Sequence, residues 1–540
     1  MSAAGVGEDE RNSMKARNIM IQGTMSDVGK SLFTAGLLRV LSQDGYRAAP
    51  FKSQNMALNS YITAQGLEMS RAQVMQAEAA GIDPDVAMNP ILLKPNSDMG
   101  SQVIVNGEVF GNLTAAQYFR RKHEFVPDIK AAYHKLEHDY EILVIEGAGS
   151  PAEINLKQND IVNMGLAQMI DAPVLLIGDI DRGGVFAQLY GTVALLEAQE
   201  RARIKGFIMN KFRGDRRLLE PGLQMLYERC PIPVVGVIPY TELDIEDEDS
   251  LSRRLLPGSV RDRIDIAVIR FPHIANFTDL NPLERISHVS LRYISDCREL
   301  GCPDLIILPG TKNTMRDLQW MRENGIETEV RRLVGSDLSL LLGICGGFQM
   351  MGEELADPYG VEAGGISRGL GYFPLRTIFG TEKVRRRVRG TILTQCSASG
   401  SRSVWERLAG STFLGYEMHM GTSDSVGGAQ PRRLMELTDE DSGSENSRHR
   451  RRADRITGGG NHMDGCISGN CIGTYVHGLF TSGTLRDNLL DLLFERRGLT
   501  RDAAGQTDYL TYKNSQYDRL ADVIREHTDL KAIYRMIGLE

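Results

Sequence analysis

Short apolar runs alternate with amphipathic stretches along the first half of the chain. The run NIMIQG (18–23) predicts a buried strand, and a glycine-rich loop and a helix from Ser31 to about Gln43 follow it. Further β-rich runs predict strands at 47–52, 141–149, 172–181, 204–212 and 233–240. This alternation predicts a mostly parallel sheet covered by helices, with ligands at the carboxyl ends of its strands.

The alternation stops at a charge-dense stretch, TELDIEDEDSLSRR (241–254), and then starts again. New strands are predicted at 264–271, 304–311 and 338–347. Because 540 residues exceed what one core usually supports, we place a domain boundary near residue 258. The predicted parts are a first domain over 15–250, a second over 260–500, a helical tail over 501–540 and an N-terminal extension over 1–13.

One segment of the second domain, residues 425–465, is polar and rich in glycine. It contains SGSENSRHRRRADRITGGGNHMDG, a composition that predicts a mobile insertion. We expect its basic cluster, Arg448–Arg452, to be solvated and not to form a binding patch.

Composition narrows the class of protein. The net charge of −8 argues against a nucleic-acid binder, which normally presents a basic face. No apolar run reaches the roughly 18 residues of a membrane-spanning helix, and the start of the chain lacks the apolar segment of a signal peptide. The seven cysteines are scattered, and their closest pairs, five residues apart, do not match zinc spacing. We expect a cytoplasmic enzyme with small-molecule ligands, no membrane or nucleic-acid partner, and the option of forming an oligomer.

The glycine-rich loop after the first strand, GTMSDVGKS (23–31), has the residues of a phosphate-binding loop. In such loops backbone N–H groups surround phosphate oxygens, a lysine neutralises charge and a hydroxyl reaches Mg²⁺. Here Lys30 and Ser31 fill those places, and five residues separate Gly23 from Gly29 where four are usual. The longer spacing resembles dethiobiotin synthetase and its relatives, which use ATP to phosphorylate a carboxylate. Partition-type ATPases carry an early second lysine where this loop begins with Thr24, and a glycine turn without nucleotide is the plain alternative.

Polar residues at other strand ends extend this site. Glu146 follows an apolar strand directly, where a carboxylate can hold Mg²⁺. Asp179 and Asp181 are placed similarly, Asn210 could face the base, and Lys52 could stabilise the transferred phosphoryl group. Each Asp or Asn could instead cap a helix.

The second half contains a candidate nucleophile in GICGGFQMMG (343–352). Glycines on both sides of Cys345 permit a tight strand-to-helix turn, like a nucleophile elbow, and the N–H of Gly346 can stabilise an oxyanion. Gly310 in LPGT could supply a further donor, and His477 in GTYVHGLF would act as general base and acid. The alternative is a buried, inert cysteine.

Long stretches resemble the cobyric acid synthase family, the glutamine-dependent amidases of cobalamin biosynthesis. The resemblance covers residues 15–500, and its stretches are QGTMSDVGKS, PFKSQNMALNS, MNPILLKP, SQVIVNGEVFG, VIEGAGSPAEINL, DIDRGGVFAQ, NKFRGD, LPGTKNT, GICGGFQMMG, GYEMHMG and GTYVHGLF. It implies an α/β fold with two parts, a P-loop dethiobiotin synthetase-like parallel-sheet domain and a class I glutamine amidotransferase-like domain.

The resemblance also implies a reaction. Cys345 would release ammonia from glutamine, ATP and Mg²⁺ in the first domain would serve to phosphorylate a corrinoid carboxylate, and ammonia would displace phosphate. The implied substrate is adenosylcobyrinic acid a,c-diamide, amidated at its b, d, e and g side chains. Two alternatives are cobyrinate a,c-diamide synthase and a nucleotide-dependent regulatory protein with an inactive glutaminase domain.

One position departs from the class I pattern. These amidotransferases usually have a glutamate two residues after the histidine, and here that residue is Leu479. Cobyric acid synthases are similar to this chain in lacking it. Glu417 and His419 in GYEMHMG are candidates for orienting His477 or for a structural role, with the structural role favoured.

Overall fold

The chain forms two compact units in a computed structural model. The structure describes residues 15–97, 100–245, 263–286, 288–393, 404–428, 431–440, 462–501 and 508–539. The first unit consists of Met1–Ala57, Glu68–Glu248 and Thr511–Glu540, and the second of Leu58–Leu67 and Asp249–Leu510. Each unit is therefore assembled from segments that are distant in the sequence. The predicted extension at 1–13 and the boundary near 258 lie outside the described residues.

A six-stranded parallel sheet forms the centre of the first unit, in the order β12-β11-β10-β1-β9-β2. Its strands are β1 (Arg17–Gly23), β2 (Ala48–Phe51), β9 (Ile142–Glu146), β10 (Val174–Asp179), β11 (Ile204–Phe212) and β12 (Val234–Pro239). All six were predicted from apolar runs. Such runs arise because strands covered on both faces need apolar side chains on both sides.

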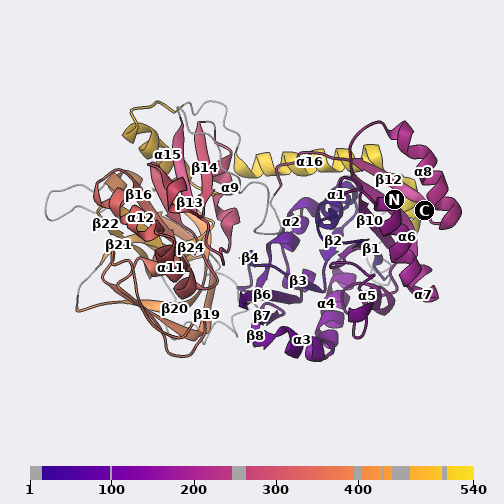
Figure 1. Cartoon of the computed structure of the whole chain (residues 1–540), viewed down its shortest axis with the longest axis horizontal. Coiled ribbons are helices and arrows are strands. Elements are labelled where there is room, and N and C mark those ends of the chain that lie inside the picture. Colours follow the sequence, from indigo (N-terminus) through magenta and orange to yellow (C-terminus); the bar gives the residue numbers. More distant parts are fainter. Residues whose placement is uncertain are drawn as a thin grey trace, which may run out of the picture. The chain divides into compact units, whose positions relative to one another are not determined.

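Helices cover both faces of this sheet (Figure 1). The helices of this unit up to residue 229 are α1 (Lys30–Gln43), α2 (Arg71–Ala80), α3 (Ala115–Arg121), α4 (Val126–Asp139), α5 (Met164–Met169), α6 (Val185–Leu195), α7 (Ala198–Arg201) and α8 (Arg216–Arg229), with 3-10 turns at Val86–Met88, Lys122–Phe125 and Ile154–Leu156. Of these, α3 packs against β8 (Glu108–Thr114), outside the main sheet. The prediction of a mostly parallel sheet covered by helices is confirmed for this unit.

The C-terminal segment returns to the first unit as α16 (Tyr509–His527) and α17 (Leu530–Ile537), drawn in yellow in Figure 1. Ala521, Ile524, Ile533 and Ile537 belong to the same buried cluster as side chains of β1, β9 and α1. A Cβ atom on Gly36 of α1 would lie only 2.7 Å from Ile524 Cγ1, so the two helices approach closely where the glycine leaves room. The tail is thus part of the first unit's core.

A small four-stranded sheet lies beside the main one in the first unit, in the order β3-β6-β7-β8. Its strands are β3 (Gln54–Met56), β6 (Ile91–Ser97), β7 (Gly100–Val105) and β8 (Glu108–Thr114). Two further short strands are β4 (Ser60–Ile62) and β5 (Glu68–Ser70). Between β3 and β5 the chain leaves the first unit for ten residues, 58–67, which belong to the second unit.

The second unit contains a twelve-stranded sheet with a parallel part and an antiparallel part. Along its path the order is β14-β13-β15-β16-β23-β22-β21-β19-β17-β18, and β20 pairs with β19 and β24. The parallel part is β13 (Ile264–Ile269), β14 (Val289–Ile294), β15 (Leu305–Leu308), β16 (Leu340–Ile344) and β23 (Cys471–Thr474). The remaining strands are β17 (Glu354–Asp357), β18 (Gly365–Arg368), β19 (Leu375–Ile392), β20 (Thr412–Ser425), β21 (Arg432–Asp439), β22 (His462–Ser468) and β24 (Val476–His477).

Seven short or medium helices and two 3-10 turns accompany this sheet among the described residues. They are α9 (Asn281–Glu284), α10 (Cys297–Leu300), α11 (Thr314–Glu323), α12 (Ile326–Gly335), α13 (Gly346–Met350), α15 (Leu485–Arg496), the start of α16, and 3-10 turns at Phe277–Leu280 and Val404–Leu408. One large apolar cluster runs from β13 to α15 and forms the core of the unit.

The prediction of a mobile insertion over 425–465 is wrong for part of that segment. Strand β21 occupies Arg432–Asp439 and pairs with β19 and β22, and β22 begins at His462. Leu434, Met435 and Leu437 are buried, so β21 contributes apolar side chains to the core of the second unit. Residues 441–461, with the basic cluster Arg448–Arg452, lie outside the described part of the chain.

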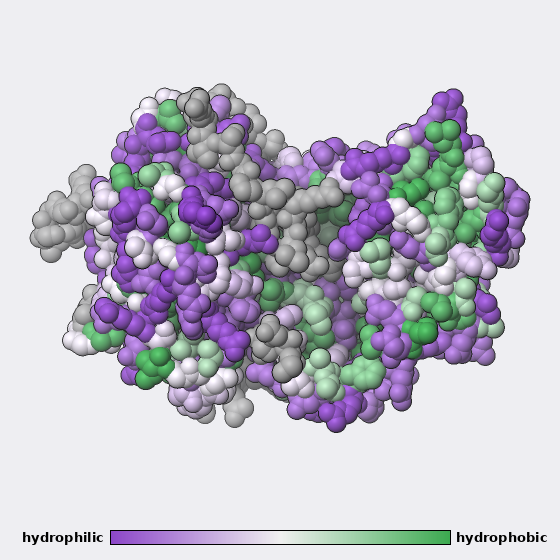
Figure 2. Space-filling view, viewed as in Figure 1, coloured by the Kyte–Doolittle hydropathy of each residue, from purple (hydrophilic) through white to green (hydrophobic). Residues whose placement is uncertain are grey.

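The visible surface is largely hydrophilic, with apolar residues in scattered patches (Figure 2). On α8 of the first unit, Leu218 and Met225 are 84% and 56% exposed. Within the described ranges, the chain has no helix with the length and apolar character needed to cross a membrane.

Candidate functional site

The phosphate-binding loop connects β1 to α1 in the first unit. Gly29 precedes the helix with φ 94° and ψ 25°, a left-handed conformation that a glycine adopts without strain. A Cβ on Gly29 would lie 2.2 Å from Asn210 Nδ2, and one on Gly23 would lie 3.0 Å from Lys30 Nζ. Both glycines are therefore required by close packing around the loop. Lys30 Nζ donates to the carbonyl oxygens of Met25 at 3.1 Å and Gly149 at 3.2 Å, which curls the side chain over the loop.

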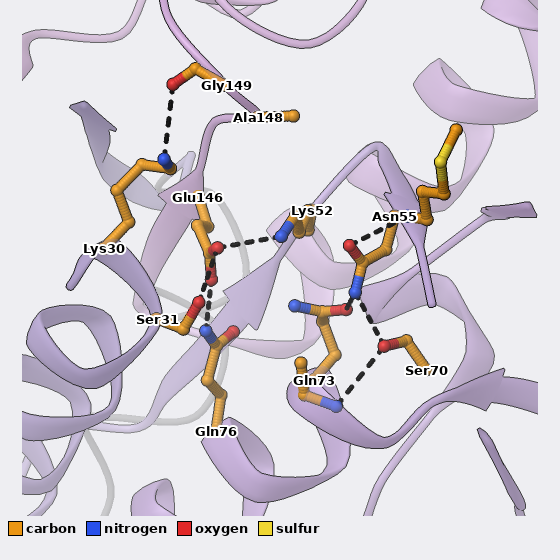
Figure 3. A network of polar contacts seen from close by, with 12 residues as sticks. Lys30, Ser31, Lys52, Asn55, Ser70, Gln73, Gln76, Glu146, Ala148 and Gly149 are labelled. Carbon is orange, nitrogen blue, oxygen red and sulfur yellow. Dashed lines mark hydrogen bonds and ion pairs between the residues drawn. The ribbon is translucent and has the colours of Figure 1, made fainter. Parts of the chain in front are cut away.

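Glu146, at the end of β9, is the centre of a buried polar network (Figure 3). Its Oε1 accepts hydrogen bonds from Ser31 Oγ at 2.9 Å and from Lys52 Nζ at 2.8 Å. Its Oε2 accepts a hydrogen bond from Gln76 Nε2 at 2.5 Å. The side chains of Glu146 and Lys52 are only 1% and 6% exposed, so this ion pair is largely shielded from water. Three residues that the sequence nominated separately thus meet at one point.

The residues present at this point fit a magnesium ion. The Ser31 hydroxyl and the Glu146 carboxylate are hard oxygen donors 2.9 Å apart, at the first turn of the helix that follows the phosphate-binding loop. Mg²⁺ binds such oxygens together with phosphate oxygens and water. With the ion bound, Lys52 would either lose its contact with Glu146 or bind the same carboxylate together with the ion.

Other nominated residues of the first unit support the loop from outside. Asn210 Nδ2 donates to the carbonyl oxygen of Val28 at 2.8 Å and so holds the loop backbone. The Thr24 amide donates to the carbonyl oxygen of Ile177 at 2.9 Å, and its hydroxyl contacts Gln188. Asp179 and Asp181 form ion pairs, with Lys211 at 2.8 Å and Arg213 at 3.0 Å respectively. Neither aspartate belongs to the Glu146 network.

A second polar network lies next to Lys52 and was not predicted. Asn55 Nδ2 donates to Ser70 Oγ at 2.7 Å and to Gln73 Oε1 at 3.2 Å (Figure 3). Asn89 joins this network to Lys52, because its Nδ2 donates to the Lys52 carbonyl at 3.2 Å and its Oδ1 accepts from the Ser70 amide at 3.2 Å. All five of these residues are buried. The sequence signal was present in the stretch PFKSQNM, but nothing local to it shows the partners.

In the second unit, Cys345 lies on the turn between β16 and α13. Its φ of 50° and ψ of −106° are unusual for a residue other than glycine and cost of the order of 1–3 kcal/mol. The flanking glycines are explained by packing, because a Cβ on Gly347 would lie 1.9 Å from the Leu308 carbonyl oxygen. The predicted elbow is therefore the observed backbone geometry, and Cys345 is 8% exposed.

His477 is held in place by a carboxylate that sequence reasoning missed. Its Nδ1 lies 2.6 Å from Asp279 Oδ2, and the amide of Gly478 donates to Asp279 Oδ1 at 3.2 Å. The His477 side chain also hydrogen-bonds to that of Cys345. Cys345, His477 and Asp279 thus form a chain of nucleophile, base and orienting acid, the arrangement of a catalytic triad. Asp279 was missed because it lies in a 3-10 turn about 200 residues before the histidine, with no local motif.

The environment of His477 favours its protonated form. Burial alone would lower the pKa of the ring, but the interactions with the neighbouring Asp279 and Cys345 side chains outweigh burial and raise the pKa of His477 to about 10. At neutral pH the ring therefore holds a proton next to the sulfur. The protonated ring can donate this proton to a nitrogen leaving group when the Cys345 sulfur attacks an amide.

The two glycines nominated for the oxyanion site lie beside this chain. A Cβ on Gly310 would lie 3.0 Å from His477 Cε1, and one on Gly346 would lie 2.6 Å from Thr311 Cγ2. Any side chain at Gly310 would push against the histidine. The backbone of LPGT and the turn after Cys345 are thus adjacent, as an oxyanion site requires.

Glu417 and His419 do not contact the Nδ1 of His477. Glu417 forms an ion pair with Arg386 and lies 3.4 Å from His462 Nε2, and although its burial opposes ionisation, these contacts lower its pKa to about 2. His419 stacks on Tyr475 with ring centroids 3.8 Å apart, and burial lowers its pKa to about 4. Leu479 is buried in the core. The favoured structural role of Glu417 and His419 agrees with these contacts.

Comparison with known proteins gives matches over nearly the full chain. Residues 19–252 match the CobQ/CobB/MinD/ParA nucleotide binding domain, and residues 265–485 match the CobB/CobQ-like glutamine amidotransferase domain. The chain is 53% identical to a cobyric acid synthase of Lachnoclostridium phytofermentans over 97% of its own length and 99% of the relative's. It is 52% identical to a cobyric acid synthase of Ruminiclostridium cellulolyticum, over 97% of this chain and 98% of the relative. The protein of that name from Yersinia enterocolitica is 47% identical, over 96% of this chain and 98% of the relative.

Proposed function

We propose the function of this chain from one premise: the chain belongs to the cobyric acid synthase family. It is a glutamine-dependent amidating ligase of cobalamin biosynthesis. We propose that it converts the b, d, e and g carboxylates of adenosylcobyrinic acid a,c-diamide to amides, which gives adenosylcobyric acid. The observation that carries the proposal is that one chain contains both a phosphate-binding loop with Lys30 and Ser31 in place and the Cys345–His477–Asp279 chain.

The glutaminase step belongs to the second unit in this proposal, within residues 260–500. The Cys345 thiol gives its proton to His477 and its sulfur attacks the side-chain amide carbon of glutamine, while the N–H groups near Gly310 and Gly346 stabilise the oxyanion. The proton on His477 passes to the leaving nitrogen, so ammonia departs and a thioester remains. His477 then takes a proton from water as the water attacks the thioester, and glutamate leaves. Asp279 holds the ring so that its other nitrogen faces the sulfur.

The activation step belongs to the first unit, within residues 15–250. The loop amides and Lys30 hold the phosphates of ATP, and Lys52 stabilises the phosphoryl group during transfer to a corrinoid carboxylate. Mg²⁺ on Ser31 and Glu146 would neutralise phosphate charge there. Ammonia attacks the resulting acyl phosphate, and the products are the amide, ADP and phosphate. Activation is needed because hydroxide is a poor leaving group.

The second candidate is cobyrinate a,c-diamide synthase, which performs the same chemistry on other carboxylates. The stretches PFKSQNMALNS and MNPILLKP favour cobyric acid synthase, and the relatives that match over the full length carry that name. The observed Cys345–His477–Asp279 chain argues against a regulatory protein with an inactive glutaminase. A cytoplasmic location remains a prediction.

Mass spectrometry of the corrinoid after incubation with purified protein, ATP, Mg²⁺ and glutamine tests the proposal. Four added amides on adenosylcobyrinic acid a,c-diamide would support it. Two added amides on cobyrinic acid, with none on the diamide, would assign the chain to the alternative reaction. Inactivity on both would overturn the enzyme proposal.

A further inference from the structure

A short segment from the first half of the sequence is built into the wall of the glutaminase site. Residues 58–67 belong to the second unit, although residues 1–57 and 68–248 on both sides belong to the first. We call residues 58–67 the inserted segment. It is the one part of the synthetase half of the sequence that the second unit contains.

The inserted segment contacts the loop that carries the orienting aspartate. The amide of Ser60 donates to Asn276 Oδ1 at 3.1 Å. Asn276 lies three residues before Asp279 and adopts a left-handed φ of 53°. Because the Asn276 side-chain oxygen accepts its hydrogen bond from the inserted segment, the conformation of the Asp279 loop depends on that segment.

The inserted segment also contacts Tyr416, whose ring stacks on the His477 imidazole. The Tyr416 ring stacks on His477 with centroids 5.3 Å apart and an interplanar angle of 20°. The Tyr416 hydroxyl donates to the Ser60 carbonyl at 3.3 Å and accepts from Asn276 Nδ2 at 3.3 Å. Ile62 is fully buried and packs against Tyr416 and Met418.

We propose that the inserted segment positions His477, with Tyr416 as the positioning residue that transmits its contacts. This inference rests on the proposed glutaminase function. Tyr416 covers one face of the imidazole, and Asp279 fixes its Nδ1; the inserted segment holds both through Ser60, Asn276 and Ile62. Tyr416 does not react. It keeps the ring in the plane that serves both Asp279 and Cys345.

The groups that face His477 determine how glutamine hydrolysis is expected to depend on pH. They are Asp279, Cys345 and Tyr416, and His419 lies close enough for its own protonation to be disfavoured by His477. A ring that tilts away from Asp279 loses part of the interaction that favours its protonated form. Loosening Tyr416 is therefore expected to move the alkaline limb of glutamine hydrolysis to lower pH.

The residues that flank the inserted segment in the sequence are hydrogen-bonded to one another within the first unit. On its N-terminal side Asn55 donates to Ser70 and Gln73, which lie just beyond its C-terminal end. This clamp is hydrogen-bonded through Asn89 to the Lys52 backbone. The chain positions on either side of the inserted segment are therefore held together by buried hydrogen bonds within the first unit.

The test compares glutamine hydrolysis with ammonia-dependent amidation in full-length variants. Ile62→Ala changes only the inserted segment, Ile62→Val is the conservative rescue, and Tyr416→Phe removes the hydroxyl and keeps the stacked ring. Asn276→Gly removes the amide group and tolerates the left-handed backbone. Tyr372→Phe is the matched control, because its hydroxyl lies in the same unit and has no hydrogen-bond partner among the described residues.

We expect Tyr416→Phe, which removes the hydrogen bonds to Ser60 and Asn276 but keeps the stacked ring, to lower kcat for glutamine hydrolysis about fivefold. Ile62→Ala and Asn276→Gly should lower it about tenfold, with the alkaline limb at lower pH and KM little changed. Ile62→Val should restore most of the rate. Amidation with ammonia should stay at the wild-type level in all of them, and Tyr372→Phe should match wild type throughout.

Three results would overturn the inference, and they can be told apart. If the wild-type protein does not hydrolyse glutamine, the proposed function fails and the inference fails with it. If wild type is active and Ile62→Ala and Tyr416→Phe keep its kcat and pH profile, the inserted segment only packs against the second unit and the proposed function stands. Parallel losses of ammonia-dependent amidation and thermal stability would likewise identify a folding defect and reject the positioning role.

Discussion

The two candidate sites differ in how their charged groups are partnered. In the first unit, Glu146 is surrounded by donors from Ser31, Lys52 and Gln76, and Lys30 is bound to backbone carbonyls. In the second unit, Cys345, His477 and Asp279 form one continuous chain in which each group contacts the next. The first site must exchange protein contacts for ligand contacts, whereas the second needs only its substrate.

This difference follows from the chemistry proposed for each site. Phosphate and metal bring several charges of their own, so the protein holds its charged side chains in internal pairs until a ligand replaces the partners. Attack on an amide creates charge only during the reaction, so the groups that stabilise it have to be oriented beforehand. Substitutions in the two units should therefore separate the two half-reactions.

Removal of the nucleophile should give the largest and most selective loss. Cys345→Ala is expected to lower glutamine-dependent amidation by at least about a thousandfold, because no other group can form the thioester. Amidation with ammonium chloride should remain, since the first unit is untouched. Glutamate release and corrinoid mass are the measurements. Cys302→Ala, an exposed cysteine in the same unit, is the control, and equal losses with both nitrogen donors would contradict the separation.

Substitution in the phosphate-binding loop should produce the opposite pattern. Lys30→Met is expected to lower amidation with either donor by roughly a hundredfold or more, because the phosphates lose a buried cation. Glutamine hydrolysis measured without corrinoid should persist. Lys205→Met removes an exposed lysine of the same unit and should behave as wild type. Loss of hydrolysis in Lys30→Met would mean that the second site is not self-sufficient.

A smaller effect is expected when the orienting acid loses its charge. Asp279→Asn should lower kcat for glutamine hydrolysis roughly ten- to a hundredfold, because the amide keeps the shape but no longer favours the imidazolium. The pKa of His477 is raised to about 10, so the wild-type proton is present below that pH and lost above it. Without the aspartate charge this loss should begin at lower pH. The pH profile of hydrolysis is the measurement, with Asp337→Asn as an exposed control; an unchanged alkaline limb would show that Asp279 does not set the protonation of the ring.

A substitution in the C-terminal helix α16 should have the smallest effect on the reaction, because it changes the stability of the first unit and not a reacting group. Leu520→Ala in α16 is expected to cost about 2–5 kcal/mol in the free energy of unfolding of the first unit, because a buried side chain is truncated. Both tryptophans, Trp320 and Trp405, lie in the second unit. Circular dichroism in urea should therefore show an earlier transition while tryptophan fluorescence keeps its wild-type midpoint. Leu218→Ala, 84% exposed, should move neither signal; a shared shift of both signals would show that the units unfold together.

Much of the parallel architecture could be predicted because buried parallel strands are continuous apolar runs. The run at 204–212 corresponds residue for residue to β11. The antiparallel part of the second unit escaped prediction for the same physical reason. Strand β19 alternates buried and less buried residues near its two ends and has a charged middle part, so its sequence has no long apolar run, and its partners lie farther along the chain.

The same contrast applies to the sites. Lys30 and Cys345 lie in local motifs whose glycines are required by the turn itself, so a short stretch of sequence is enough to identify them. Asp279 and Tyr416 act through the arrangement of distant segments around His477. The stretch PFKSQNMALNS was noticed as a resemblance, but its division between two units depends on contacts that no local pattern encodes.

The order of segments along the chain has a consequence for how the molecule can be divided. The chain changes unit after residues 57, 67, 248 and 510, which makes four crossings and five segments. A gene split in the charge-dense stretch near residue 250 would therefore yield two products that each lack a segment of their own unit. The N-terminal product would lack α16 and α17, and the C-terminal product would lack residues 58–67. Reassembly of such fragments would have to exchange both pieces at once, so any separation of the two activities into independent proteins requires rewiring of the chain and not a single cut.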